Sequence, residues 1–517
     1  MADGPDQMTR DWPGIAAAAS VAALIAGPVL AVLWFAGGGA LPGPGDWAAV
    51  RFTLLQATLS AGLSVALAVP VARALARRQF AGRRVLITLL GAPFILPVIV
   101  AVLGLLAVFG RSGVLNLGLG WLGLPPVQIY GLHGVVLAHV FFNLPLATRI
   151  LLQGWQQIPA ERFRLAASLG LGPAQVARIL ERPMLRATVP GALLVIFAIC
   201  LSSFAVALTL GGGPRATTVE LAIYQAFRFD FDLGRAAVLA LIQTGLVGAA
   251  ALAALRVSRG DGLGAGMDRA LRRWDANSLA LRVQDATVLT LAALFLLVPL
   301  SMIVIKGLAG LPHMPNSVYS ALIVSVCVSL LSMSLTMLLT LTMGLAALRH
   351  GWIEAIGLLG VAMSPLVLGT GLFILINPWL NPSSLALPVT ALANALAALP
   401  FALRVVLPAL RRAEHDFGPL ADGLGMAGWA RLRWLYLPRA RPALGFAAGL
   451  SAALSMGDLG VITLFADPQQ ATLPLQMYRL MGAYRMEAAA GAGLLLLAAS
   501  LAIFWTFDKG GRSDADA

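Results

Sequence analysis

The chain has 517 residues, of which 59% are apolar and only 11% charged, and its mean hydropathy is +0.86. This composition excludes a soluble protein, because no globular core could bury so much apolar surface. A β-barrel is disfavoured as well, since the apolar stretches run for about 20 residues without two-residue alternation. The sequence therefore predicts an all-α membrane protein that crosses the bilayer many times.

Twelve spans are expected in chain order. They lie near residues 14–36, 50–72, 85–109, 132–154, 187–210, 234–255, 286–308, 318–347, 353–377, 387–410, 440–465 and 487–507. The first apolar run is too long for a cleavable signal peptide. The net charge of +13 would suit a nucleic-acid partner, but with the N-terminus inside, most of the 36 Lys and Arg residues fall on cytoplasmic loops. The basic charge is thus a topology signal, and it predicts an inner-membrane protein with both termini in the cytoplasm.

The two halves of the chain resemble each other at a constant offset of 255 residues. The matched pairs include Pro145 and Pro400, Arg149 and Arg404, Ala166 and Ala421, Gly170 and Gly425, and Pro183 and Pro438. Two six-span repeats of parallel topology explain this pattern. We expect a first repeat over residues 1–255, a basic cytoplasmic linker over 256–285 with an interfacial helix around Leu271–Trp274, and a second repeat over 286–517.

The loops between spans four and five of each half share a spacing. In each loop a glycine, Gly170 or Gly425, precedes a proline by thirteen residues. A glycine that ends a short helix can take a positive φ angle, and a proline suits the first turn of the next helix. We therefore expect a helix–turn–helix along the cytoplasmic face in each half, open to a docking partner.

These two loops resemble the signature loop of ATP-binding-cassette (ABC) importer permeases, in which a coupling helix docks into an ATPase subunit. Besides the glycines and prolines, Ala166 and Ala421 match the family's second alanine. The family's glutamate position holds Arg164 in the first half and Pro419 in the second, while the acids Glu161 and Asp416 stand three residues earlier. The resemblance implies ATPase docking at both loops, and an ordinary amphipathic loop is the alternative.

Longer segments, densest over residues 128–245, resemble the permease subunits of thiamine transporters. That resemblance implies import of thiamine and its phosphate esters, a periplasmic solute-binding protein and two copies of a cytoplasmic ATPase. The related ferric-iron permeases share the double-length layout, so ferric iron is the alternative substrate.

The chain is not expected to be an enzyme, and no cofactor or metal is expected. A phosphate-binding loop needs a lysine followed by Ser or Thr, whereas Lys306 and Lys509 are each followed by glycine. ATP hydrolysis is therefore assigned to separate subunits. A secondary transporter, the less favoured alternative, would require paired charges near the midplane of both halves.

Polar residues inside spans are candidates for the solute pathway. His139 and Asn143 share one helical face next to Phe141. In the second half, Asn394 occupies the position that corresponds to His139. Asn143 could instead satisfy backbone carbonyls that Pro145 leaves free.

Asp458 occupies the position in the second half that corresponds to Ser203, and it is the only acid that we place well within a span. It is predicted either to cap a broken helix or to stabilise a cationic solute. The outer loops 211–233 and 466–486, with their mixed charges including Glu220, are expected to be the surface on which a binding protein lands. A solvated rim without that role explains the charges equally well.

Overall fold

The computed structural model describes residues 5–37, 41–91, 95–211, 213, 216–257, 273, 275, 278–466 and 471–512. All regular elements among them are helical. In the first half these are α1 Pro5–Ala36, α2 Pro44–Arg77, α3 Arg83–Leu89, α4 Val98–Phe109, α5 Val114–Trp121, α6 Leu132–Gln157, α7 Ala160–Ser168, α8 Pro173–Val176, the π turn η2 Ala177–Glu181, α9 Arg182–Leu201, α10 Phe204–Leu210, α11 Val219–Arg228 and α12 Leu233–Val257.

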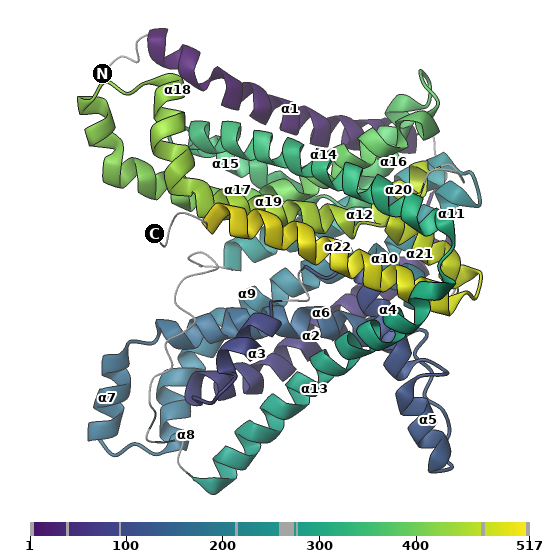
Figure 1. Ribbon diagram of the computed structural model, residues 1–517, viewed down its shortest axis with the longest axis vertical. Coiled ribbons are helices and arrows are strands. Elements are labelled where there is room, and N and C mark those ends of the chain that lie inside the picture. Colours follow the sequence, from purple (N-terminus) through teal and green to yellow (C-terminus); the bar gives the residue numbers. More distant parts are fainter. Residues whose placement is uncertain are drawn as a thin grey trace.

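The second half runs from α13 to α22 (Figure 1). Its elements are α13 Leu279–Gly310, η5 Leu311–His313, α14 Asn316–Ala347, α15 Gly351–Leu358, η6 Leu359–Ala362, α16 Pro365–Ile376, η7 Pro382–Leu385, α17 Ala386–Gly423, α18 Gly428–Arg431, the π turn η8 Leu432–Tyr436, α19 Leu437–Met456, α20 Gly460–Phe465, α21 Leu473–Gly482 and α22 Met486–Arg512.

Eleven helices of the described residues are long and apolar enough to cross a membrane, or twelve when the bent pair Gly351–Val361 and Pro365–Ile376 counts as one span. The all-α polytopic fold predicted from composition is therefore confirmed. Four of the expected spans are interrupted: 85–109, 187–210, 353–377 and 440–465. Two of the interruptions end at a proline: Pro97 is the N-cap of α4, and Pro365 is the first residue of α16. A proline suits a helix start because it has no N–H group to leave unpaired.

The segment that joins the halves is shorter than its expected bounds of 256–285. Helix α12 continues to Val257, and α13 begins at Leu279 with Ser278 as its N-cap. The expected interfacial helix around Leu271–Trp274 lies outside the described residues except for Arg273.

The first helix of each half packs against the other half. Helix α1 lies against α14, α15 and α16, while α13 lies against α2 and α4. Each of them also contacts the last helix of its own half, α12 or α22 respectively. This exchange fastens the halves together along their length.

The two ends of the molecule differ in how the halves meet. Figure 1 shows the halves diverging towards the end that carries α7 and α18, and meeting at the end that carries α11 and α21. One apolar cluster contains residues of both halves, including Tyr224 of α11 and Leu480 of α21. The ring of Phe373 in α16 packs edge-on against Phe227 of α11 and Phe465 of α20. Two other clusters belong to single halves, apart from α13 residues that join the first.

Candidate docking loops and solute pathway

The first loop folds as its glycine predicts. Helix α7 ends at Ser168, and Gly170 takes a φ of +65°. The N–H of Leu171 donates to the carbonyl of Ala166, and the N–H of Gly170 donates to that of Ala167. These two bonds form a Schellman motif, which closes the end of the helix and reverses the chain.

The second loop repeats this geometry residue for residue. Gly425 has a φ of +63°, Met426 donates to the carbonyl of Ala421, and Gly425 donates to that of Asp422. One expectation is wrong here, because no separate short helix precedes Gly425. The residues before it form the end of α17, which runs unbroken from Ala386 to Gly423 despite three internal prolines.

Each loop contains a π turn shortly before the proline that lies thirteen residues after its glycine. In η2 the N–H of Arg182 donates to the carbonyl of Ala177, and in η8 the N–H of Leu437 donates to that of Leu432. Pro183 and Pro438 follow, each in the first turn of α9 or α19. A proline has no N–H group to donate to the carbonyl four residues earlier. The π turn compensates, because the N–H before the proline bonds the carbonyl five residues earlier.

The surface of the loops is apolar at matching positions. The alanines Ala166 and Ala421 are buried, whereas the acids Glu161 and Asp416 and the arginine Arg164 are exposed. Four leucines that sequence reasoning passed over project into solvent with 61–68% of their surface exposed: Leu165, Leu169, Leu420 and Leu424. They stand in pairs at the 255-residue offset, and that repetition was the available signal.

The two loops are held in place by different groups. Arg273, from the joining segment, places its guanidinium 4.9 Å from the centre of the Phe163 ring in α7. It also forms ion pairs with Glu181 of η2 at 2.7 Å and with Asp275 at 2.6 Å. Burial alone would lower the pKa of Arg273, but the bonds to Asp275 and Glu181 outweigh it and raise that pKa.

The second loop is held by Arg431, which belongs to α18 itself. Its guanidinium pairs with Glu414 of α17 at 2.7 Å and with Asp422 at 2.5 Å. The Tyr436 hydroxyl donates to the other oxygen of Glu414. The second loop is therefore secured from within, whereas the first depends on the segment that joins the halves.

In the first half, His139 is buried between two serines. One ring nitrogen lies 3.1 Å from the hydroxyl of Ser60 on α2, and the other lies 2.6 Å from that of Ser203. Ser203 lies in the break between α9 and α10, so the histidine ties α6 to that break. A neutral imidazole fits this arrangement, since one nitrogen donates and the other accepts.

The neighbours of His139 have structural contacts. Asn143 donates to the carbonyl of His139 at 2.9 Å and to the sulfur of Cys200 at 3.4 Å. Asn143 therefore bonds a backbone carbonyl, as one of the two expectations held. That carbonyl is not the one of Phe141, which lacks its helical donor because Pro145 has no N–H group. Phe141 is fully buried and packs edge-on against Phe142 and Phe295 of α13.

In the second half the polar groups are different. Asn394 donates to the hydroxyl of Ser455 at 3.0 Å, near the end of α19. Asp458 lies in the break between α19 and α20, and its Oδ1 accepts from the N–H of Gly460 at 3.1 Å. Its Oδ2 is buried and has no hydrogen-bond partner among the described residues. Asp458 thus caps α20 with one oxygen and leaves the other available.

Relatives of known name cover 87–98% of the chain, although no protein-family model matches it. It is 40% identical over 480 residues to the thiamine transport system permease protein ThiP of Salmonella typhimurium, which covers 90% of this chain and 89% of that protein. The protein of the same name from Escherichia coli is 37% identical over 525 residues, or 96% of each chain. The chain belongs to the thiamine transport system permease family.

A more distant likeness points to the same class. A probable ABC transporter permease protein, y4oQ of Sinorhizobium fredii, is 31% identical over 204 residues, which cover 38% of this chain and 66% of that protein. With its membrane-crossing helices, the chain is thus a multi-pass membrane permease. The family resemblance inferred from the loops and from residues 128–245 is confirmed.

Glu220 corrects the expectation of a solvated rim over 211–233. That stretch contains α11, and Glu220 in its first turn is only 1% exposed. Its Oε1 accepts from the Ser364 hydroxyl at 2.5 Å and from the Gln243 side-chain amide at 3.2 Å. The acid inside the apolar run Thr218–Tyr224 was the signal for a buried carboxylate.

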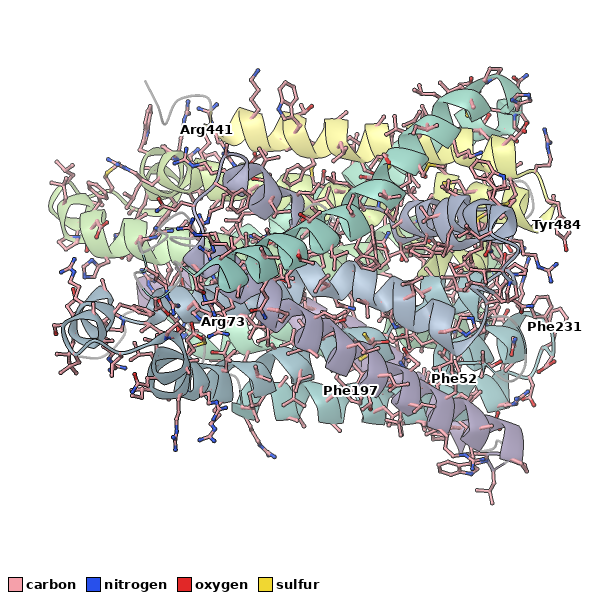
Figure 2. The ribbon with its side chains drawn as sticks, turned by 90° about the horizontal axis from the view of Figure 1, so that it is seen from below. Phe52, Arg73, Phe197, Phe231, Arg441 and Tyr484 are labelled. Atoms are coloured by element: carbon pink, nitrogen blue, oxygen red, sulfur yellow. The ribbon has the colours of Figure 1, made fainter. Side chains whose placement is uncertain are left out.

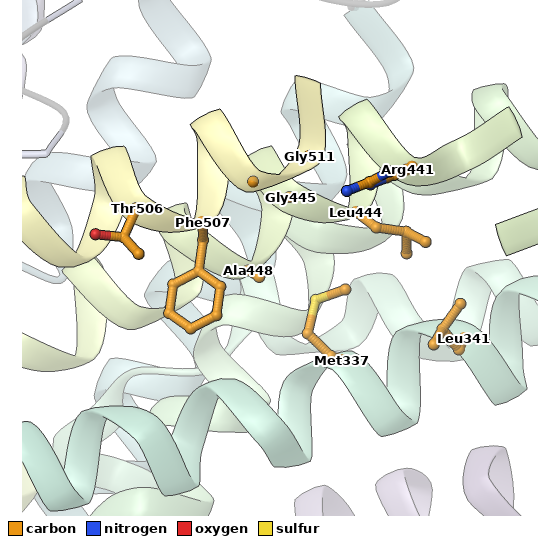
Figure 3. A pocket seen from close by; sticks show the side chains of 10 residues that line it. Met337, Leu341, Arg441, Leu444, Gly445, Ala448, Thr506, Phe507 and Gly511 are labelled. Carbon is orange, nitrogen blue, oxygen red and sulfur yellow. The ribbon is translucent and has the colours of Figure 1, made fainter. Parts of the chain in front are cut away.

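A separate groove of about 480 Å³ lies on the second half, between α14, α19 and α22 (Figure 3). Its lining is largely apolar and includes Met337, Leu341, Leu444, Ala448 and Phe507, with Arg441 at one side. None of the candidate pathway residues lines this groove.

Proposed function

We propose that this chain is the permease subunit of a binding-protein-dependent ABC importer that moves thiamine and its phosphate esters across the inner membrane. The observation that carries the proposal is the 34–40% identity to proteins named as thiamine transport permeases, over 87–98% of the chain. The paired loops support it, because they offer two docking surfaces of the same shape at one end of the molecule.

The two loops would each receive one copy of a cytoplasmic ATPase. The exposed leucines provide the apolar contact, and the matched Schellman turns hold both loops in one geometry. The assignment covers Glu161, Arg164, Ala166, Gly170 and Pro183 in the first half and Asp416, Ala421, Gly425 and Pro438 in the second. The chain itself would hydrolyse no ATP, so its energy comes from these partners.

This assignment sets the orientation of the molecule. The α7/α18 end faces the cytoplasm with both termini, and the α11/α21 end faces the periplasm and receives the solute-binding protein. Because the halves meet at the α11/α21 end and diverge at the other, the structure corresponds to a state closed to the periplasm. Transport then requires the halves to separate at the α11/α21 end and close at the other.

We further propose that the halves are duplicated repeats, with bounds at 1–255 and 286–517 and a linker between them. The matching π turns and the matching breaks after α9 and α19 support this reading. Helix α13 begins at Leu279, within the proposed linker.

The solute would pass between the broken helices of the two halves. The candidate contacts are His139, Asn143, Phe141, Ser203, Asn394 and Asp458. Of these, Asp458 has the clearest chemistry, because a carboxylate with an unpartnered buried oxygen suits a solute whose thiazolium ring is cationic. The contacts of Asn143 and Phe141 give them structural roles beside the route.

Uptake into proteoliposomes tests the proposal. The chain would be reconstituted with the ATPase and binding protein of its transporter, and ATP-dependent uptake of labelled thiamine would be compared with that of ferric iron. We expect thiamine uptake only; iron uptake without thiamine uptake would overturn the substrate assignment.

The same assay tests Asp458. We expect Asp458→Asn to lower kcat/KM for thiamine roughly tenfold, since a charge contact shielded from water exceeds the 1.4 kcal/mol that tenfold represents. Asp508→Asn near the end of α22 is the matched control and should leave uptake unchanged. If Asp458→Asn transports at the normal rate, Asp458 is not on the route.

A further inference from the structure

The buried carboxylate of Glu220 lies where the two halves meet. Glu220 belongs to α11 of the first half, and Ser364, whose hydroxyl donates to it, is the N-cap of α16 in the second half. The same serine oxygen accepts from the N–H of Leu366, so its only proton is directed at Glu220. One hydrogen bond thus joins the halves directly.

The contacts extend from Glu220 to the interrupted helices of both halves. The Gln243 amide nitrogen of α12 bonds Glu220 and also the carbonyl of Leu201, the last residue of α9 before its break. Ser364 lies at the bend between α15 and α16, where the two helical segments meet at 95°. Glu220 therefore lies between the break of one half and the bend of the other.

The partners of this carboxylate are neutral. Among the side chains that the structure describes, no Lys, Arg or His forms an ion pair with Glu220 within 4.0 Å. Removing a carboxylate from water is unfavourable unless hydrogen bonds or a countercharge replace the lost hydration. Here a hydroxyl and an amide replace it only in part. Separation of the halves would break the Ser364 bond and return the carboxylate to water.

We propose that Glu220 is a positioning residue, present in one half only, that disfavours the state of the permease in which the α11/α21 end is closed. The hydrogen bonds from Ser364 and Gln243 offset part of this effect. The proposal rests on the proposed function, because the bias matters only if the halves alternate. It acts from the first half alone, since Pro474 stands two residues after Thr472, the N-cap of α21, where Glu220 stands two residues after Thr218, the N-cap of α11.

The proposal predicts that two substitutions shift the balance between the closed and the open state in opposite directions. Glu220→Gln keeps the shape and an oxygen that can accept from Ser364, but removes the charge that opposes closure. It should favour the closed state. Ser364→Ala keeps the charge and removes its donor, so it should favour the open state. A residue with only a structural role would give the same direction for both, because each would simply loosen the contact.

The distance between the tips of the two outer segments reports the state. Phe231 and Tyr484 are exposed and lie at the α11/α21 end (Figure 2). Spin labels at Phe231→Cys and Tyr484→Cys would be used in a Cys327→Ser background, in nanodiscs with the ATPase and binding protein. Dipolar spectroscopy would then give the closed and open populations at rest and after trapping with ATP and vanadate.

In the trapped state we expect Glu220→Gln to raise the closed-to-open ratio on the order of fivefold or more, and Ser364→Ala to lower it. The effect of Ser364→Ala should shrink in the double variant, because a neutral amide depends less on the lost donor. Glu487→Gln makes the same chemical change at an exposed site of the same end and should leave the ratio unchanged.

An unchanged ratio in Glu220→Gln, or a shift of both variants in one direction, overturns the proposal. If one variant is not recovered folded, the sign of the other decides. The distances do not depend on which solute is carried. If the distances shift but thiamine is not taken up, the substrate assignment is refuted and the role of Glu220 stands. If thiamine is taken up but the distances do not change, the role of Glu220 is refuted and the substrate assignment stands.

Discussion

Replacing Arg273 with methionine should release the first loop, around Gly170, and leave the second, around Gly425, in place. The guanidinium is 2% exposed, and its partners Glu181 and Asp275 are 3% and 1% exposed. Removing one partner of a buried ion pair destabilises by about 3–5 kcal/mol, because the remaining charge stays buried without its partner. Glu181 keeps Arg73 at 2.7 Å, so the lower value of about 3 kcal/mol applies, most of it at Asp275.

Hydrogen–deuterium exchange of the two loops measures this effect locally. A loss of about 3 kcal/mol in the free energy of opening corresponds to roughly hundredfold faster exchange of the amides in α7. The end of α17 and α18, held by Arg431, should exchange at the normal rate and serves as an internal control. Neutralising the stranded acid as well, with Arg273→Met and Asp275→Asn together, should restore part of the protection.

The matched control for this prediction is Arg182→Met. Arg182 follows Glu181 in the chain, but its side chain is exposed. It should not alter exchange in either loop. Equal acceleration in both loops, or none in α7, would refute the idea that the joining segment supports the first loop.

Two further predictions concern glycines. Gly425→Ala should destabilise the second loop by about 1–2 kcal/mol, because the φ of Gly425 is +63°. Gly423→Ala, at the last residue of α17 with open space around it, should stabilise by up to about 1 kcal/mol. Opposite shifts in the melting temperature would verify the pair, and equal shifts would contradict it. Gly104→Ala should lower the melting temperature, because its Cβ would lie 2.7 Å from the carbonyl of Pro299, while Gly118→Ala in open space serves as the control; a normal melting temperature for Gly104→Ala would contradict the tight packing of α4 on α13.

Several features were predictable because they depend on local chemistry. Apolar stretches about 20 residues long predict spans whatever they pack against. A glycine that ends a helix predicts a positive φ angle, as at Gly170 and Gly425. The turns of the two loops were also predictable in outline, since their glycines and prolines recur at one offset. The leucines beside them were passed over, because a single leucine in a loop does not tell which side faces solvent.

The sequence by itself determined the membrane class, the approximate number of spans, the turns of the two loops and the family. Tertiary structure alone decided that α1 and α13 cross to the opposite halves, and that Arg273 supports only the first loop. It also decided that Glu220 is buried against Ser364 rather than solvated. The physical reason is range: helix formation and turn geometry depend on neighbours in sequence, whereas burial of a charge depends on partners far along the chain, 144 residues away for Glu220 and 92 for Arg273.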